Sequence, residues 1–263
     1  PDRHWLAEDV FQRLEVIRAI QDEESVPYLT QLTLQRRCAD GICELQREIW
    51  YGPSLRTAPE VITRERLRPN FIFGTNALAF IDTAPLHPTA YHPWGRTLAN
   101  DVHAALIVDL IAYVDSAGEI PEQAGPEGEI LVLSHYRGQI AVIRRMLGKR
   151  YHDRGVAVRT VHRSQGSEAT TAILDLTLAA NVPPRISSVL TAVRPEHDGS
   201  RLLAVAASRA RSRLIVVGDI DWIERATARQ TVLRRVIAHL RENAYRIPIE
   251  EVRPAGSHLQ LVR

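Results

Sequence analysis

The 263-residue sequence has few of the residues on which disulfide-stapled or metal-bound folds depend: two cysteines, one methionine and a single lysine, Lys149. Cys38 and Cys43 form no CxxC pair, and no histidine stands beside them at zinc-ligand spacing. Neither a disulfide framework nor a metal site is therefore supported. We expect both cysteines to be ordinary helix residues.

Long apolar runs are also missing. No stretch approaches the roughly 18 consecutive apolar residues that a membrane helix needs, and the first residues are too polar for a secretory signal. We expect a cytoplasmic protein with no membrane partner. With 45% hydrophobic and 24% charged residues, the chain is long enough for one large or two small domains with a proper core.

Positive charge comes almost entirely from arginine, and the formal net charge is only +2. The coding bias of a GC-rich genome explains most of these arginines more simply than function does. Arginine still grips phosphate groups through paired hydrogen bonds, so individual positions are more informative than the total. Mild basicity permits nucleic-acid binding without establishing it.

From Leu78 onward, the apolar residues alternate between the period of strands and the period of helices. This pattern predicts an α/β fold, in which a parallel sheet is flanked by helices. The expected strands are 78–83, 130–134, 156–161, 171–176 and 213–219. The expected helices are 96–117, 136–149, 202–210 and a long amphipathic helix over 222–243.

The first part of the chain differs, with helices expected at about 8–20 and 39–50 and Pro or Gly breaks at 52–53 and 59. We expect a lead-in segment over 1–30, the sheet domain over 31–245 and a tail over 246–263. The chain starts at Pro1 and runs almost at once into a helix. This start suggests a trimmed product or an excised piece of a longer chain.

The stretch TVHRSQGSE (160–168) lies between two apolar runs and carries Gln, Gly and Glu close together, as a ligand loop does. Three more segments accompany it: LTLQRRCADGICELQREIWYGPSLRT (32–57), ILVLSHYRGQIAVIRRML (130–147) and RLLAVAASRARSRLIVVGD (201–219). In order and spacing, the four resemble motifs of the superfamily 1 helicases. The branch they resemble contains the RNA helicase of nonsense-mediated decay and the nuclease-helicase of Okazaki-fragment processing.

This resemblance covers most of the chain and implies a RecA-like P-loop NTPase fold, specifically the second motor domain. In such helicases ATP lies between two RecA-like domains. Arg209 matches the motif VI arginine finger, which stabilises charge on the γ-phosphate. Arg37 matches a second γ-phosphate ligand. The resemblance places further nucleotide contacts at Gln35, Arg36, Gln165, Gly166 and Glu168, with Glu168 accepting hydrogen bonds from the ribose and Gly166 permitting close backbone approach.

Ser134, Tyr136 and Thr160 match positions at strand ends that face single-stranded nucleic acid in this family. Hydroxyls and backbone N–H groups at such positions bind phosphate oxygens. Simpler interpretations stand beside these roles. Arg209 also suits a helix cap, Arg37 a surface salt bridge, and Glu168 a solvated loop. The two strand-end hydroxyls also suit local backbone contacts, and the scattered histidines suit packing or surface positions.

The sequence departs from the family pattern in places. Arg36 stands where an aromatic residue is usual, which weakens the case for base stacking, although a guanidinium also stacks on adenine. Cys38, Ala39 and Asp40 replace the usual Met-His-Pro. Ser208 replaces a threonine, and Arg163-Ser164 removes an aromatic residue before Gln165.

The sequence contains no GxxxxGK[ST] phosphate loop and no Asp-Glu pair that would hold Mg²⁺ at the end of a buried strand. We expect ATP and Mg²⁺ to be bound mainly by a first RecA-like domain that partners this one. The expected function is that of the second motor domain of an ATP-dependent helicase on single-stranded DNA or RNA, moving 5′ to 3′ by resemblance, and inactive alone. A stand-alone nucleic-acid- or protein-binding module remains an alternative. A nuclease or other hydrolase on an α/β scaffold is disfavoured because neither an acidic cluster nor a nucleophile elbow occurs.

Overall fold

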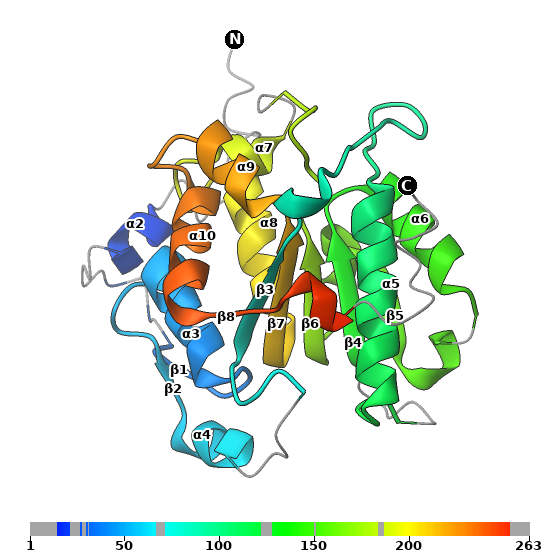
Figure 1. Cartoon of the computed structure of the whole chain (residues 1–263). Helices are drawn as coiled ribbons and strands as arrows, with labels where there is room; N and C mark the ends of the chain where they lie inside the picture. Colours follow the sequence, from blue (N-terminus) through cyan, green and yellow to red (C-terminus); the bar gives the residue numbers. More distant parts are fainter. Residues whose placement is uncertain are drawn as a thin grey trace.

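A six-stranded sheet forms the centre of the computed structural model, which describes residues 15–21, 27, 30, 32–66, 72–121, 128–149, 151–183 and 187–252 (Figure 1). The strand order is β5-β4-β6-β7-β3-β8, and every strand pair in this sheet is parallel. The strands are β3 (Leu78–Asp82), β4 (Gly128–Ser134), β5 (Val156–Thr160), β6 (Ala169–Asp175), β7 (Ala210–Gly218) and β8 (Tyr245–Arg246). The predicted α/β fold with a parallel sheet is confirmed, and it is that of a RecA-like domain.

Helices cover both faces of the sheet (Figure 1). Alternate residues of β4 point to opposite faces: Leu131 and Leu133 belong to one buried cluster, and Ile130 and Val132 to the other. The first cluster contains residues of α3 (Asp40–Gln46), α8 (Asp198–Ala207), α9 (Ile220–Ala226) and α10 (Val232–Asn243). The second contains residues of α5 (Asp101–Ser116) and α6 (Arg137–Leu147). A sheet buried on both faces explains why its strands read as apolar runs.

All five predicted strands are confirmed, with shifts of one to three residues at their ends. The helix predicted at 202–210 begins earlier, as α8 at Asp198. Two helix predictions were wrong in extent. The helix expected from residue 96 begins only at Asp101, because the Asn100 side chain accepts a hydrogen bond from the His103 N–H and caps it there.

The helix expected over 222–243 is two helices, α9 and α10. Thr227 leaves the helical conformation, and Thr231 caps the start of α10 by accepting from the Arg234 N–H. The amphipathic period continues through the break because both helices bury one face on the same cluster. The apolar period of the sequence therefore does not indicate the break between α9 and α10.

The first part of the chain adds small elements at one edge. The described part of the helix expected at 8–20 is α2 (Val16–Gln21), and the rest of that expectation lies outside the described residues. The helix expected at 39–50 is α3 followed by a π-helical turn over Arg47–Tyr51, which ends at Gly52. A two-stranded parallel sheet pairs β1 (Leu34–Gln35) with β2 (Arg56–Thr57), and α4 (Pro59–Arg66) follows.

The remaining elements are short. They are α7 (Ser188–Thr191) and the 3-10 turns Ala84–Leu86, His152–Arg154, Val161–Ser164 and Ile249–Val252. Ile247, Ile249 and Val252 belong to the second buried cluster, so the described part of the expected tail packs against the sheet domain. Within the described residues, none of the helices is long and apolar enough to cross a membrane.

Candidate functional site

The 160–168 loop connects the end of β5 to the start of β6. A 3-10 turn over Val161–Ser164 follows Thr160, and the Ser167 N–H then donates to the Ser164 carbonyl at 2.9 Å. Gly166 has a φ of 80°, and a Cβ added there would meet no atom within 4 Å. Its backbone conformation is the reason for glycine in the described structure, since side-chain-bearing residues rarely adopt it.

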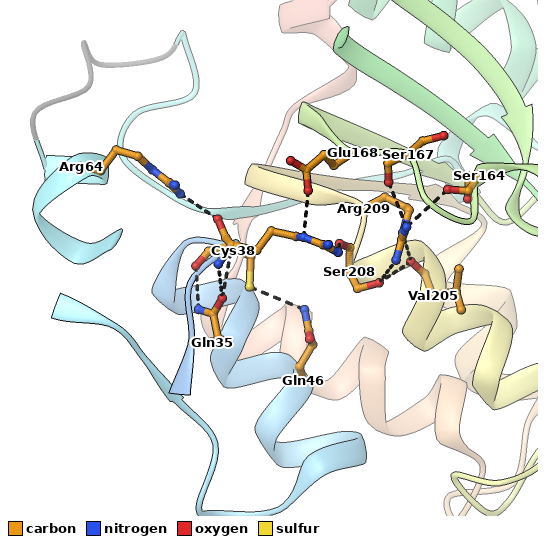
Figure 2. A network of polar contacts seen from close by, with 11 residues as sticks. Gln35, Cys38, Gln46, Arg64, Ser164, Ser167, Glu168, Val205, Ser208 and Arg209 are labelled. Atoms are coloured by element: carbon orange, nitrogen blue, oxygen red, sulfur yellow. Dashed lines mark hydrogen bonds and ion pairs between the residues drawn. The ribbon is translucent and has the colours of Figure 1, made fainter. Parts of the chain in front are cut away.

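Arg209 fastens this loop to the end of α8 (Figure 2). Its Nε donates to the Val205 carbonyl at 3.1 Å, its Nη1 donates to the Ser167 carbonyl at 2.9 Å, and its Nη2 donates to the Ser208 hydroxyl at 2.9 Å. The residue is half-buried. The helix-capping interpretation therefore describes its present contacts, and the same contacts hold the guanidinium directly beside the loop.

Arg37 brings a second guanidinium to the same place from the other end of the sequence. Its Nε lies 2.9 Å from Glu168 Oε2, and its Nη1 donates to the Ser208 carbonyl at 3.4 Å. Burial lowers the pKa of Arg209, and the nearby charge of Arg37 lowers it further, whereas Glu168 raises it. Two guanidinium groups thus share one carboxylate. The resulting excess of positive charge suits an anionic phosphate group.

Gln35 shapes the turn that carries Arg37. Its side-chain oxygen accepts from the backbone N–H groups of Arg37 and Cys38, each at 2.9 Å. Its amide nitrogen donates to the Cys38 carbonyl at 2.8 Å (Figure 2). The same nitrogen donates to Thr57 Oγ1 at 3.0 Å. The Gln35 side chain therefore holds the turn that positions Arg37.

Two other expected nucleotide contacts lie apart from this network. Arg36 points to α4, where its Nε lies 2.7 Å from Glu60 Oε1 in an exposed ion pair. Gln165 is exposed on the 160–168 loop. Sequence patterns missed Arg64, which donates from Nη2 to the Arg37 carbonyl at 2.7 Å. No signal in the sequence points to that contact, because Arg64 lies on α4, which the motif pattern leaves out.

The expected nucleic-acid residues lie at the opposite edge of the sheet. Ser134 ends β4 and Thr160 ends β5, and the two are direct partners in the strand register. Glu168 and Arg209, by contrast, immediately precede β6 and β7. Because the strands are parallel, one group occupies the carboxyl edge of the sheet and the other the amino edge. The structure therefore places Glu168 and Arg209 at the opposite edge of the sheet from Ser134 and Thr160.

At the carboxyl edge the hydroxyls are turned inward. Ser134 is fully buried, its Oγ lies 2.8 Å from Thr177 Oγ1, and it accepts from the Tyr136 N–H at 3.1 Å. Thr160 is also buried. Tyr136 is half-buried and stands immediately before α6. The local-backbone interpretation of Ser134 matches its contacts, and Tyr136 is the most accessible of the three.

A buried polar network that the sequence did not reveal supports this edge. Asp175 Oδ1 lies 2.8 Å from His103 Nδ1, and His103 Nε2 lies 2.8 Å from Thr83 Oγ1. Gln139 donates to Asp175 Oδ2 at 2.5 Å and accepts from the Asn100 N–H at 2.7 Å. Carboxylate, imidazole and hydroxyl stand in the order of a nucleophilic triad. All three side chains are fully buried, so the network stabilises the strand ends and cannot meet a substrate.

Comparison with known proteins identifies the family to which the chain belongs. A family model described as an AAA domain matches residues 6–221, most of the chain. The chain belongs to this family of helicase-like AAA domains. Such domains occur in superfamily 1 helicases, so the four sequence segments resembled the correct superfamily. No curated protein matches the chain.

Membership of this family implies a nucleic-acid helicase motor domain that uses ATP and Mg²⁺. Among the described residues, the guanidinium groups of Arg37 and Arg209 have the charge and hydrogen-bond donors that suit the phosphate groups of ATP. No group of three His, Cys, Asp or Glu residues in the described part of the chain is arranged to hold a metal ion. Both cysteines are free and buried, and burial raises the pKa of Cys38 to about 12, so its thiol stays protonated near neutral pH.

Proposed function

We propose that this helicase-like domain is the second RecA-like motor domain of an ATP-dependent helicase or translocase on single-stranded nucleic acid. The observation that carries the proposal is the meeting of Arg37, Glu168 and Arg209 at one edge of the sheet. These residues come from three of the four motif segments, and the fold brings them together as a nucleotide site requires. By resemblance, the motor belongs to the branch of the nonsense-mediated-decay helicase and moves 5′ to 3′.

In this function the domain completes a site whose phosphate loop and Mg²⁺ ligands belong to a first RecA-like domain. Arg209 and Arg37 would hold the γ-phosphate, and bound ATP would supply the phosphoryl group whose transfer drives movement. Glu168 would accept hydrogen bonds from the ribose. Arg209 already lies beside the 160–168 loop, and exchanging its carbonyl contacts for phosphate oxygens would keep each donor satisfied. Closure of two domains around the nucleotide would then shift the carboxyl edge along the strand.

One observation favours the stand-alone binding module. Each side-chain nitrogen of Arg209 donates to an atom of its own chain, so the guanidinium has a complete structural role without nucleotide. A module that only binds nucleic acid or protein would keep these contacts for stability alone. The two functions differ in whether Arg209 affects phosphoryl transfer.

The test measures ATP turnover by the 263-residue chain and by the product of the complete gene, each with and without single-stranded DNA or RNA. We expect the 263-residue chain to be inactive and the complete product to be stimulated by nucleic acid. Arg209→Ala should lower that turnover at least about 10³-fold, the effect typical of an arginine finger. Arg241→Ala, which removes a guanidinium on α10 that pairs with Asp221 and Glu224 outside the network, is the matched control and should stay within about twofold of wild type.

Absence of turnover in the complete gene product would support the binding module. Turnover by the 263-residue chain that Arg209→Ala abolishes would show that the chain builds a whole site by itself, against the proposal. Arg209→Lys keeps the charge but not the planar fork, and its thermal unfolding midpoint separates a loss of stability from a loss of catalysis.

A further inference from the structure

The segment between β3 and α5 forms an ordered loop at the carboxyl edge of the sheet. Tyr91 and Ala99 exchange two backbone hydrogen bonds, at 2.8 and 2.9 Å, in an antiparallel bridge that closes the loop. Within it, His92 Nδ1 lies 3.0 Å from the Thr97 carbonyl, and Gly95 turns the chain with a φ of 52°. In Figure 1 the loop that leads into α5 projects beyond the strand ends. We call residues 91–99 the tryptophan loop.

The tryptophan loop carries an indole on its outside. Trp94 is 53% exposed, whereas Trp50 is buried and Trp222 packs against the core. An indole left in water forgoes much of the stabilisation that its burial would bring, roughly 25 cal/mol for each Å² of apolar surface. Tryptophan exposed at the tip of an ordered loop is typical of a surface that covers a ligand.

The first turn of α6 holds the tryptophan loop in place. The Gly138 N–H donates to Thr97 Oγ1 at 2.8 Å, and a Cβ added at Gly138 would lie 2.7 Å from Pro93 Cγ and 2.8 Å from the Leu98 carbonyl oxygen. This contact is so close that only glycine fits. Tyr136 lies two residues before Gly138, so the loop is fixed beside the expected nucleic-acid residues. Trp94 is therefore presented on a preorganised support.

The charges around the tryptophan loop favour an anion. Arg96 in the loop and Arg137 at the start of α6 are exposed. Arg145, further along α6, is close enough to lower the pKa of the Tyr91 hydroxyl, against the stronger effects of burial and Asp101. Asp101 is the opposing acidic group, and the Tyr91 hydroxyl donates to it at 2.7 Å. Exposed guanidinium groups in the loop and on α6, together with an exposed indole, make a combination that binds single-stranded nucleic acid.

We propose that the tryptophan loop extends the path of single-stranded nucleic acid along the carboxyl edge, with the Trp94 indole stacking on one base and Arg137 contacting a phosphate. This inference rests on the proposed function, because it takes the partner to be the strand on which the motor moves. It adds a stacking surface that compensates for the inward-turned Ser134 hydroxyl at this edge. Stacking is independent of sequence because every base has a π face, which suits a translocase.

The test measures binding of the 263-residue chain to a fluorescent oligothymidylate and to a strand of equal length without bases, by fluorescence anisotropy over a range of salt concentrations. Trp94→Ala should weaken oligothymidylate binding about tenfold and leave binding to the abasic strand unchanged. Trp94→Phe should recover most of the lost affinity. Arg137→Ala should weaken both strands and lower the slope of log Kd against log salt by about 0.7, as one lost phosphate contact does.

Leu32→Ala is the matched control. Leu32 is 85% exposed and lies beside β1, away from the carboxyl edge, so its removal should not change either affinity. Equal oligothymidylate affinities for wild type and Trp94→Ala would overturn the inference and leave the proposed function standing. If Trp94→Ala instead changes only the oligomeric state in sedimentation, the loop is a protein contact. Failure of the wild-type chain to bind any single strand would also overturn the inference, whereas the proposed function is tested separately by turnover of the complete gene product.

Discussion

His135 is a residue whose environment makes the stability of the domain depend on pH. The residue is half-buried, but its Nε2 atom is fully enclosed and has no hydrogen-bond partner. Burial lowers the pKa of this imidazole to about 4, and nearby His162 acts in the same direction, while Asp175 opposes both. The folded state therefore holds a neutral His135 where the unfolded chain would bind a proton.

The sign of the pH effect follows from this difference. Between the unfolded pKa near 6.5 and the folded pKa of about 4, the unfolded state binds more protons, so acidification lowers the free energy of unfolding. His135 should cost about 2 kcal/mol of stability between about pH 7.5 and about pH 5. His135→Phe keeps the ring and removes the titration.

Urea unfolding at the two pH values measures this effect. The wild-type chain should lose about 2 kcal/mol more than His135→Phe on acidification. The remaining titratable groups are the same in both proteins, so their contributions to the pH dependence cancel in the comparison. Equal losses would show that the imidazole is hydrated in the folded state and titrates normally.

At the scale of elements, Asn100 determines where α5 begins and ties that helix to the sheet. It is fully buried, its Oδ1 accepts from the His103 N–H at 3.1 Å, and its Nδ2 donates to the Thr177 carbonyl at 3.2 Å. Asn100→Ala should lower the free energy of unfolding by about 2 to 3 kcal/mol, because it removes a cap and leaves a buried carbonyl unpaired.

The matched variant for Asn100 is Thr231→Ala at the start of α10. Thr231 is also buried, but its single capping bond, from the Arg234 N–H, is long at 3.4 Å. We expect a loss of about 1 kcal/mol or less. Chemical unfolding of both variants at one temperature compares them. Equal losses would mean that the Thr177 contact contributes nothing beyond capping.

Element types were predictable where local physics decides them. Apolar periods of two and 3.6 located all five strands and most helices of the sheet domain, because burial on one or both faces leaves that trace in the sequence. Asn100 and Thr231 are capping residues, and capping signals at both positions would have corrected the two wrong helix predictions. The pairing of β8 with β3 had no such signal, since a two-residue strand has no period.

The candidate site also has a part that the sequence predicts and a part that it does not. The motif pattern indicated Arg37, Glu168 and Arg209, and the fold brings these three together. The contacts that join the segments, such as Arg37 with Ser208 and Arg209 with Ser167, connect residues 42 or more positions apart, and no local rule gives those. The inward turn of Ser134 toward Thr177 likewise results from the fold, whereas the contacts of Gln35 with Arg37 and Cys38 are local to their own turn.

At the scale of the whole molecule, the sheet separates two groups of expected site residues. The Arg37–Glu168–Arg209 group lies at the amino edge, and Ser134, Tyr136 and Thr160 lie at the carboxyl edge. Since the described side chains of the two groups make no contact with each other, each should be removable without disturbing the other in an isolated domain. Coupling between them would then arise only when nucleotide closes two domains.

This separation gives a paired prediction. In the 263-residue chain, Arg37→Ala should change the Kd for a single-stranded oligonucleotide by less than about twofold, because its side chain contacts only the amino-edge group. Tyr136→Ala should raise that Kd about fivefold or more through loss of a ring at the strand-binding edge. Tyr136→Leu, which removes the ring and keeps an apolar side chain, serves as a second carboxyl-edge variant should Tyr136→Ala unfold.

In the complete gene product the order should reverse. Arg37→Ala should lower maximal ATP turnover at saturating oligonucleotide by about tenfold or more, whereas Tyr136→Ala should raise the oligonucleotide concentration for half-maximal stimulation and leave the maximum nearly unchanged. Arg241→Ala, whose side chain pairs with Asp221 and Glu224 outside both groups, should affect neither quantity. If Arg37→Ala weakens oligonucleotide binding by the 263-residue chain as much as Tyr136→Ala does, the two edges act as one site. The assignment of nucleotide to the amino edge and strand to the carboxyl edge would then be wrong.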